Sequence, residues 1–260
     1  MGGAILQGLR RPEVTVEGGI RATNRSEEKA AALRGPDVLS LATSVDPDAQ
    51  ATALRGARIV LVGVKPAMVP DVLAEIRDLL EPDAIVVSVA AGVTIATMEA
   101  LVPNTVFRSM PNTPSFVGRG VTGVAAGSRA NPDDAALVRT LFETVGSVVE
   151  LPEEKIDALS TISGSGPAYV FFLIERLTDT ARNLGFDEPT ARLLVEETFR
   201  GASELLAASD VDPAELRRRV TSPKGTTERA IAVLEAADLT STFDEATAAA
   251  LARAKELSQG

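Results

Sequence analysis

The sequence predicts an α/β domain over residues 1–150 followed by an all-α domain over residues 151–260. The first part alternates short apolar runs rich in β-branched residues with segments of helical spacing, which is typical of βαβ units on a mainly parallel sheet. After Pro152 no strand-like run appears outside segments of helical spacing. A length of 260 residues accommodates two such domains.

In the first domain the expected strands and helices follow one another along the chain. Residues 58–64 and 84–90 are continuous apolar runs, as expected of strands buried on both faces. We expect strands at residues 17–23, 58–64, 84–90, 105–110, 120–126 and 147–151. We expect helices at residues 27–33, 69–80, 95–101 and 132–145, the last with Asn131 as its cap and Pro132 at its first position.

The second domain is a succession of helices, expected at residues 153–161, 167–184, 188–208, 213–220, 226–236 and 243–257. The helix at 167–184 is apolar almost all round from Tyr169 to Ile174. Such a helix must be covered on every side, which one small helical domain can hardly do. We therefore expect a subunit interface there.

The composition narrows the chemistry that this chain can perform. It has no cysteine and no histidine, which excludes disulfides, a thiolate nucleophile, a Ser-His-Asp triad and metal sites built on those ligands, and we expect no bound metal. With 26 basic and 36 acidic residues the net charge is −10, and no basic stripe is present to bind nucleic acid. No apolar run is long enough for a membrane span, and residues 1–11 lack the layout of a signal peptide, so we expect a cytoplasmic protein.

Ligands of open α/β sheets bind beyond the carboxyl ends of the strands, and the strand at 17–23 is followed by Asn24, Arg25 and Ser26. A dinucleotide fold that prefers NAD carries an acidic residue at this position. Arg25 can instead pair with a 2′-phosphate, and Ser26 can add a contact at the helix start. This favours NADP over NAD. A plain helix cap beside a surface arginine is an alternative of equal weight.

Three further loops follow expected strands of this domain. Lys65 lies where a cofactor would cross the sheet, and Pro66 fixes the turn into the next helix. The small residues Ala90-Ala91-Gly92 let a flat ring approach the backbone, although close helix–strand packing explains them as well. Asn112 stands between two prolines in a rigid polar loop, which an ordinary turn rarely needs.

Two loops of the helical domain combine glycine with hydroxyl side chains. Residues 163–167 (SGSGP) are expected to open the helix at 167–184, and residues 221–227 (TSPKGTT) to open the helix at 226–236. Free amides at a helix start attract anions, and the second loop also offers a lysine, so it suits a small carboxylate. Ordinary capping by Ser and Thr is the alternative for both loops.

The N-terminal segment looks like the helix that follows a glycine-rich dinucleotide loop. Such a domain opens with an apolar strand and the fingerprint G-x-G-x-x-G, of which Gly2 would be the last glycine. The strand and the first two glycines would then precede Met1, and residues 17–23 would be strand two of the order 3-2-1-4-5-6. The missing strand is central, so its two neighbours are expected to have unpaired edges. A native N-terminal helix with small residues is the alternative.

Five motifs occur in order along the chain, namely VGVKP (62–66), SVAAGV (88–93), RSMPNTP (108–114), SGSGPAY (163–169) and TSPKGTT (221–227). With them the chain strongly resembles the pyrroline-5-carboxylate reductases, from Gly2 to Leu257. The resemblance implies a Rossmann-type NADP-binding domain, incomplete at its N-terminus, and a helical substrate-binding domain that forms a homodimer, with rings of dimers as a further assembly. It implies NADPH-dependent reduction of 1-pyrroline-5-carboxylate to L-proline, with NADH as the alternative cofactor.

The resemblance also implies roles for individual residues. The cofactor would be bound by Gly2, Asn24, Arg25, Ser26, Val64, Lys65, Pro66, Ala90, Gly92 and Asn112. The substrate would be bound by Ser222, Gly225, Thr226 and Thr227. Thr227 would hydrogen-bond the ring nitrogen and is the predicted catalytic residue. An iminium is already electrophilic, so holding it at near-attack distance from a nicotinamide requires no histidine or cysteine.

Two alternatives remain open from the sequence. A related imine or β-hydroxyacid reductase shares the architecture, but the hydroxyacid enzymes usually use a lysine of the helical domain, and neither Lys155 nor Lys224 stands in that sequence context. The second alternative is a truncated, non-catalytic scaffold that forms a dimer through its helical half. A substrate panel with NADPH tests the first alternative, and the codons upstream of Met1 test the second.

Overall fold

The computed structural model describes residues 1–259, with side chains through Glu256. Its contacts divide the chain into two compact units. The first consists of Met1–Ser165 with the segment that begins at Leu251, and the second consists of Gly166–Ala250. The described strands end at Glu150, where the sequence pattern changes, whereas the division between the units falls further along, at Gly166.

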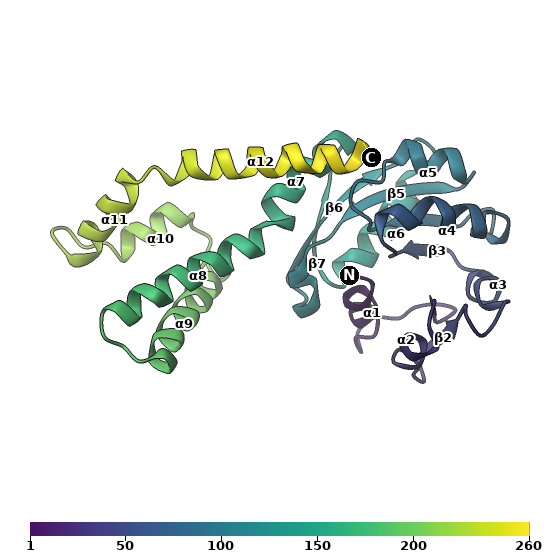
Figure 1. Ribbon diagram of the computed structural model, residues 1–260, viewed down its shortest axis with the longest axis horizontal. Helices are drawn as coiled ribbons and strands as arrows, with labels where there is room; N and C mark the ends of the chain where they lie inside the picture. Colours follow the sequence, from purple (N-terminus) through teal and green to yellow (C-terminus); the bar gives the residue numbers. More distant parts are fainter. Residues whose placement is uncertain (260) are drawn as a thin grey trace. The chain divides into compact units, whose positions relative to one another are not determined.

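The first unit alternates strands with short helices (Figure 1). Its strands are β1 (Ile20–Asn24), β2 (Val38–Ala42), β3 (Ile59–Val62), β4 (Ile85–Ser88), β5 (Thr105–Met110), β6 (Gly120–Ala126) and β7 (Gly146–Glu150). Its α-helices are α1 (Gly2–Leu9), α2 (Glu27–Ala31), α3 (Ala49–Leu54), α4 (Val69–Ile76), α5 (Ile95–Leu101), α6 (Pro132–Glu143) and α7 (Ile156–Leu159). The short turns are the 3₁₀ segments η1 (Pro66–Met68), η2 (Arg77–Leu79), η3 (Thr113–Val117) and η4 (Glu153–Lys155), and the π-helix η5 (Ser160–Gly164).

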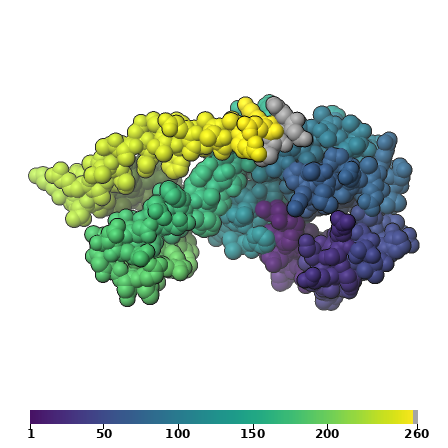
Figure 2. Space-filling view, in the orientation of Figure 1, coloured from purple at the N-terminus to yellow at the C-terminus, as the bar shows by residue number. Residues whose placement is uncertain are grey.

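Two sheets share this unit. β1 and β2 form a parallel pair, and the larger sheet has the order β3-β4-β5-β6-β7. Among the described residues the β5–β6 pair alone is antiparallel, so the expected mainly parallel sheet is confirmed. Neither β1 nor β3 has a second neighbour among the described strands, as expected for strands that flank a central one. Figure 2 shows a hollow between the β1–β2 region and the body of the larger sheet.

The larger sheet is covered on both faces, because alternate residues of each strand point to opposite sides. Val86 of β4 belongs to a core with α3, α4, α5 and α7, whereas Ile85 and Val87 belong to a core with α1 and α6. All residues of β4 are buried, as expected. In β3, by contrast, only Val62 is buried, since this strand has a neighbour on one side alone in the described part of the chain.

The structure corrects the N-terminal region in three places. The strand expected at residues 17–23 begins at Ile20, because Gly18 and Gly19 have φ angles of 78° and 77° and form a turn. β2 was not expected; Ser40 (1% exposed) lies on its buried face between Val38 and Ala42, and Leu39 (48% exposed) lies on the other face, so apolar residues occupy both faces. α3 was not expected either, since six residues of an alanine-rich segment show no clear helical spacing.

The second unit is all-α, as expected. α8 (Gly166–Asn183) and α9 (Glu188–Ala207) lie side by side (Figures 1 and 2). α10 (Pro213–Arg219), α11 (Thr226–Ala236) and α12 (Leu239–Gln259) follow, and the last continues into the first unit. The small core between α8 and α9 contains Ile174, Ala181, Ala191, Val195 and Phe199. None of the described helices has the length and apolar character that crossing a membrane requires.

Much apolar surface of this unit is uncovered in the single chain. On α8, in the segment expected to need cover on every side, Phe171 is 61% exposed and Phe172 is 58% exposed. Other large apolar side chains that are exposed on α8, α9 and α11 are Val170, Leu173, Leu177, Leu193, Leu194, Leu205, Leu206, Val233 and Leu234. Exposed apolar surface of this extent marks a protein–protein contact.

Candidate active site

The loop after β1 carries the first predicted cofactor residues. The backbone carbonyls of Asn24 and Arg25 accept hydrogen bonds from the amides of Thr43 and Ser44 (2.9 and 3.1 Å), which fixes this loop to the end of β2. The Arg25 side chain is exposed and has no hydrogen bond or ion pair with a residue that the structure describes. Ser26 caps α2 without a side-chain cap bond. Both side chains are therefore free to contact a ligand.

The start of α1 and the end of β3 lie together. A Cβ placed on Gly63 would lie 3.9 Å from the Cα of Gly2, so the two backbones approach closely. Val64 packs against the core on the α4 face of the sheet. Lys65 precedes Pro66, the first residue of η1, and its ammonium is exposed without an ion pair among the described side chains. This end of the sheet thus offers accessible backbone and a free cation.

The loop after β4 offers backbone rather than side chains. Ala90 is 4% exposed, and its methyl group belongs to the core beneath α4 and α5. The Ala90 amide donates to Ser88 Oγ (3.2 Å), and Ser109 Oγ on β5 donates to the Ser88 carbonyl (2.8 Å). Gly92 has a φ of 78°, which favours glycine. The loop is therefore held rigidly, and a ligand could meet the backbone of Ala90 but not its side chain.

Asn112 follows β5 and is 7% exposed. Its Nδ2 donates to the Ser163 carbonyl (2.9 Å), and its Oδ1 accepts from the Val121 amide (2.8 Å). The side chain therefore joins the loop after β5 to the start of β6 and to η5. A direct contact of this carboxamide with a nicotinamide stays a prediction.

Residues 163–167 lie where α8 begins, as expected from the sequence, but the residues just before α8 are already helical. α7 runs directly into η5, where the Ser165 amide donates to the Ser160 carbonyl (2.9 Å), five residues earlier. α8 then begins at Gly166. The Ser165 amide is thus bonded within this run and is not open to an anion.

Arg108 forms buried ion pairs beneath these loops, which the sequence analysis did not predict. Arg108 of β5 is 4% exposed and contacts Asp157 of α7 (2.5 Å) and Glu153 of η4 (3.3 Å). Glu153 also accepts a hydrogen bond from the Ile95 amide at the start of α5 (2.7 Å). These contacts join β5, α5 and α7. In the sequence, the signal for these ion pairs was an arginine directly after Val106 and Phe107 in an expected strand. An arginine buried in a strand requires acidic partners.

The loop predicted to bind substrate opens α11 in the second unit. Gly225 caps α11, and its amide donates to the Ser222 carbonyl (3.0 Å). A Cβ at Gly225 would clash with Ser222 Oγ (2.5 Å) and with the Ser222 carbonyl (2.9 Å), so this position requires glycine. Thr226 is exposed and Thr227 is half-buried, and neither hydroxyl bonds to a described residue. The four predicted substrate residues therefore form one helix start with free hydroxyl groups.

Lys224 has an unusual backbone conformation in this loop. Its φ of 61° lies in the left-handed region, which costs a residue with a side chain about 1 kcal/mol. Its amide donates to the carboxylate of Glu228 in the first turn of α11 (2.9 Å). One backbone amide of the loop is therefore already occupied by an acidic side chain.

The basic cluster at residues 217–219 is neutralised by its own neighbours. Glu215 accepts hydrogen bonds from Arg218 (2.7 Å) and Arg219 (2.8 Å), and Arg217 pairs with Glu235 (2.6 Å). The bonds from Arg218 and Arg219 lower the pKa of Glu215 to about 2. This is a solvated helix face rather than an anion site.

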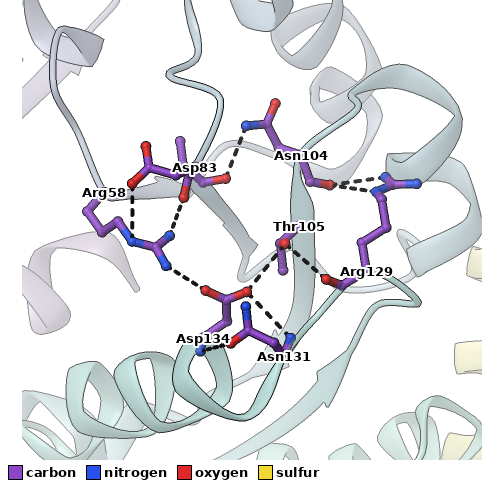
Figure 3. Close-up of polar contacts among 8 residues, drawn as sticks. Arg58, Asp83, Asn104, Thr105, Arg129, Asn131 and Asp134 are labelled. Atoms are coloured by element: carbon purple, nitrogen blue, oxygen red, sulfur yellow. Dashed lines mark hydrogen bonds and ion pairs between the residues drawn. The ribbon is translucent and has the colours of Figure 1, made fainter.

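The opposite, amino edge of the larger sheet is closed by a polar network (Figure 3). Asp134, 3% exposed, contacts Arg58 (2.6 Å), which also reaches Asp83 (3.6 Å). Arg129 donates to the Asn104 carbonyl (3.1 Å), and the Asn104 side chain donates to two further carbonyls (2.8 and 3.1 Å). Both arginines drawn there are engaged, so the network offers no free cation to a ligand.

The predicted site residues fall into three groups. Gly2, Lys65 and the loops after β3, β4 and β5 share one edge of the larger sheet, because these three strands are parallel. Asn24, Arg25 and Ser26 end a strand of the smaller sheet, and no hydrogen bond between described residues joins them to that edge. The substrate loop belongs to the second unit.

Two known protein families match different parts of the chain. Residues 153–257 match the family described as "Pyrroline-5-carboxylate reductase dimerisation". Residues 1–92 match the family described as "NADP oxidoreductase coenzyme F420-dependent". The first match spans the helical part of the chain, and the second spans the loops after β1, β3 and β4.

Relatives match along the whole chain. The pyrroline-5-carboxylate reductase of Pseudomonas aeruginosa is 36% identical over 262 residues, which cover 100% of this chain and 94% of the relative. That of Corynebacterium melassecola is 38% identical, with coverage of 99% and 95%. A solved pyrroline-5-carboxylate reductase from Coxiella burnetii superposes with a TM-score of 0.91 at 36% identity, covering 99% of this chain and 94% of that one. A Plasmodium falciparum pyrroline carboxylate reductase, solved with NADP bound, superposes with a TM-score of 0.81 at 26% identity, covering 99% and 94%. The resemblance found in the motifs is thus confirmed, and the chain belongs to the pyrroline-5-carboxylate reductase family.

Proposed function

We propose that this protein reduces 1-pyrroline-5-carboxylate to L-proline with NADPH, the final step of proline biosynthesis. The observation that carries the proposal is the pair of free cations, Arg25 and Lys65, that follow the carboxyl ends of β1 and β3. Cations left without partners at that position suit the phosphates of a dinucleotide. Relatives of nearly full length bear the name of this reductase, which supports the substrate.

The adenosine end of the cofactor belongs to the loop after β1. Arg25 is free to form a bidentate pair with the 2′-phosphate, while Asn24 and Ser26 offer hydrogen bonds to the ribose and phosphate. Gly2, at the start of α1, brings backbone amides without a side chain to the pyrophosphate. These residues fit NADPH, and NADH is the weaker alternative because it leaves Arg25 without a phosphate.

The nicotinamide end belongs to the loops after β3 and β4. Val64, Lys65 and Pro66 follow β3, and Ala90 and Gly92 present backbone to a flat ring. Bound NADPH supplies the hydride that reduces the C=N carbon of the substrate. The protein's part is to hold the two reactants in a near-attack geometry.

The substrate belongs to the start of α11. Backbone amides in the first turn of α11, beginning with that of Thr226, would hold its carboxylate together with the Ser222 hydroxyl, since a helix N-terminus favours negative charge. The free hydroxyl of Thr227 would hydrogen-bond the ring nitrogen and fix the orientation of the C=N bond. No protein acid is needed if the substrate binds as the iminium.

The assembly we propose is a homodimer through the helical domain. The exposed apolar side chains of α8 and α9 support it, as does the match of residues 153–257 to a dimerisation family. A ring of such dimers and a cytoplasmic location complete the proposal.

The function is tested with the purified protein, pyrroline-5-carboxylate and NADPH. We expect loss of the reduced-nicotinamide absorbance with formation of an equal amount of proline. The same assay with other cyclic imines and with β-hydroxyacids plus NADP tests the alternative reductases. Turnover of one of those substrates in place of pyrroline-5-carboxylate would contradict the proposal.

Replacing Thr227 tests the substrate site. Thr227→Ala is expected to lower kcat by roughly one to two orders of magnitude, the cost of one positioned hydrogen bond. Thr198→Ala on α9 is the control, because the Thr198 hydroxyl is bonded to the Leu194 carbonyl (2.6 Å) within its helix. Steady-state rates equal to the parent's for Thr227→Ala would remove this residue from the mechanism.

A further inference from the structure

One carbonyl group in the run from α7 to α8 lacks the usual α-helical donor four residues later. In an α-helix each carbonyl accepts the N–H four residues later. Four residues after Ser163 stands Pro167, which has no N–H. The Ser163 carbonyl therefore cannot form the bond that an α-helix would give it, and a part-buried carbonyl without a donor costs free energy.

Asn112 supplies this donor from 51 residues earlier in the chain. Its Nδ2 lies 2.9 Å from the Ser163 carbonyl, and its Oδ1 accepts from the Val121 amide at 2.8 Å. A carbonyl can only accept and an amide N–H can only donate, so these two partners fix which way the carboxamide faces. At 7% exposure the side chain is buried, and both of its polar atoms are occupied by the protein.

The same contact fixes η5 to the carboxyl edge of the larger sheet. A Cβ placed on Gly164 would lie 3.6 Å from Met110 Cε, at the end of β5. β5 runs parallel to β4, whose carboxyl end leads to Ala90 and Gly92. η5 is thus held at the edge to which the nicotinamide is assigned above. Short π-helical segments are frequent at functional sites.

We propose that Asn112 is a positioning residue, whose carboxamide gives Ser163 the hydrogen bond that Pro167 cannot give and so holds η5 against the carboxyl edge of the sheet. This inference rests on the proposed function, because what is positioned is the edge where hydride transfer takes place. Asn112 acts through η5 and the loop after β5. A displacement of about 1 Å in a near-attack geometry is enough to lower turnover roughly 100-fold.

Two isosteric variants test the proposal. Asn112→Asp retains an oxygen to accept from the Val121 amide but replaces the donor to Ser163 with a second oxygen. Asn104→Asp is the matched control. Asn104 is 5% exposed and its Nδ2 also donates to backbone carbonyls (2.8 and 3.1 Å), but it lies at the amino edge of the sheet.

We expect Asn112→Asp to lower kcat by about 10- to 100-fold while the KM for NADPH changes by less than about threefold, because the loss concerns geometry in the transition state. Asn104→Asp is expected to lower Tm and to leave kcat of the folded protein at the parent value. A kcat of Asn112→Asp equal to that of the parent overturns the proposal. So does a fall in kcat that is the same in both variants.

Hydrogen exchange provides a readout besides activity. The Ser165 amide, bonded to Ser160, reports on η5. In Asn112→Asp its exchange is expected to quicken by about tenfold or more, and in Asn104→Asp to match the parent. Equal protection of Ser165 in the parent and in Asn112→Asp overturns the proposal. A parent protein without reductase activity contradicts the proposed function instead, and the exchange data still decide whether Asn112 holds η5.

Pro167 gives an independent test, because Pro167→Ala restores an N–H four residues after Ser163. The fall in kcat caused by Asn112→Ala is then expected to be about tenfold smaller in the Pro167→Ala background than in the parent. If Asn112→Ala lowers kcat by the same factor in the parent and in Pro167→Ala, the claim that both residues act on the Ser163 carbonyl is contradicted.

Discussion

At the amino edge of the larger sheet, Arg58 and Arg129 are both bonded within the network of Figure 3, and the carboxylate of Asp134 is buried among them. At the carboxyl edge, Lys65 is exposed and has no partner among the described residues, and Arg25 is equally free at the end of β1. Lys65 and the network lie at opposite ends of strands of the larger sheet, whereas Arg25 ends a strand of the smaller sheet. The two groups of charges differ in whether they are satisfied by the protein itself or left for a ligand.

This difference separates stability from function in one sheet. Charges bonded within the protein stabilise the fold, and their removal leaves a buried partner unsatisfied. Charges without a partner contribute little to the fold, so their removal is expected to affect binding alone. Each prediction below tests one side of this distinction.

The largest effect is expected at Arg108, the buried cation on β5. Arg108→Met leaves Asp157 and Glu153 without their counter-charge and is expected to lower the free energy of unfolding by about 3 kcal/mol. Arg139→Met is the control, since Arg139 contacts Glu150 at 2.7 Å but is 43% exposed, and we expect a much smaller loss. Denaturant unfolding measures both. Equal decreases in the free energy of unfolding for the two variants would show that burial does not determine how strongly these ion pairs stabilise the fold.

Arg25 and Arg58 give the direct test of the two edges. Arg25→Ala is expected to raise the KM for NADPH by about 10- to 100-fold and to leave that for NADH nearly unchanged, because the 2′-phosphate loses its partner. Arg58→Ala is expected to lower the free energy of unfolding by about 2 kcal/mol and to leave both KM values unchanged. Steady-state kinetics and denaturant titration are needed for each variant. Equal loss with both cofactors would exclude the 2′-phosphate role of Arg25.

A smaller effect is expected at Lys224, whose left-handed backbone is strained. Lys224→Gly is expected to raise the free energy of unfolding by about 1 kcal/mol, because glycine adopts a φ of 61° without a steric penalty. Lys155→Gly is the control, since the φ of Lys155 is −93° and glycine there adds only chain entropy to the unfolded state. If Lys224→Gly lowers Tm as much as Lys155→Gly does, the backbone of Lys224 is not strained.

The smallest effect is expected at Glu215, an exposed acid bonded to its own arginines. Its pKa is lowered from 4.5 to about 2 in the folded protein, so its contribution to stability is present above pH 4.5 and is lost as the pH falls toward 2. Glu215→Gln is expected to lower Tm slightly at neutral pH and to match the parent near the acidic end of that range. A Tm difference that does not depend on pH would rule out this charge effect.

The sequence predicted those parts of the fold that depend on local pattern. The buried run of β4 and the cap of α6 are examples, since β4 is buried throughout and Asn131 caps α6 with Pro132 in its first turn, as expected. β2 was missed because its apolar residues lie on both faces, with Val38 and Ala42 buried and Leu39 exposed, so the segment shows no alternation of apolar and polar residues.

The candidate site shows the same limit. The glycines, hydroxyls and cations of the loops stand out in the sequence, because their chemistry is carried by single short motifs. The bonds that fix those loops do not, since Asn112 reaches Ser163 across 51 residues, and Arg108 reaches Glu153 and Asp157 across 45 and 49. Long-range partners of buried polar groups follow from tertiary packing, which one sequence does not display.

The pairing of β1 with β2 alone has a consequence for how the protein responds to its ligand. A two-stranded sheet has little stability of its own, so amides of Ile20–Asn24 should exchange through local opening more readily than those of the five-stranded sheet. Any molecule that binds only the closed form of this region draws the opening equilibrium toward it by mass action. Occupancy of the Arg25 loop by a dinucleotide should therefore slow exchange most in β1 and β2, which makes the protection of this small sheet a direct gauge of saturation.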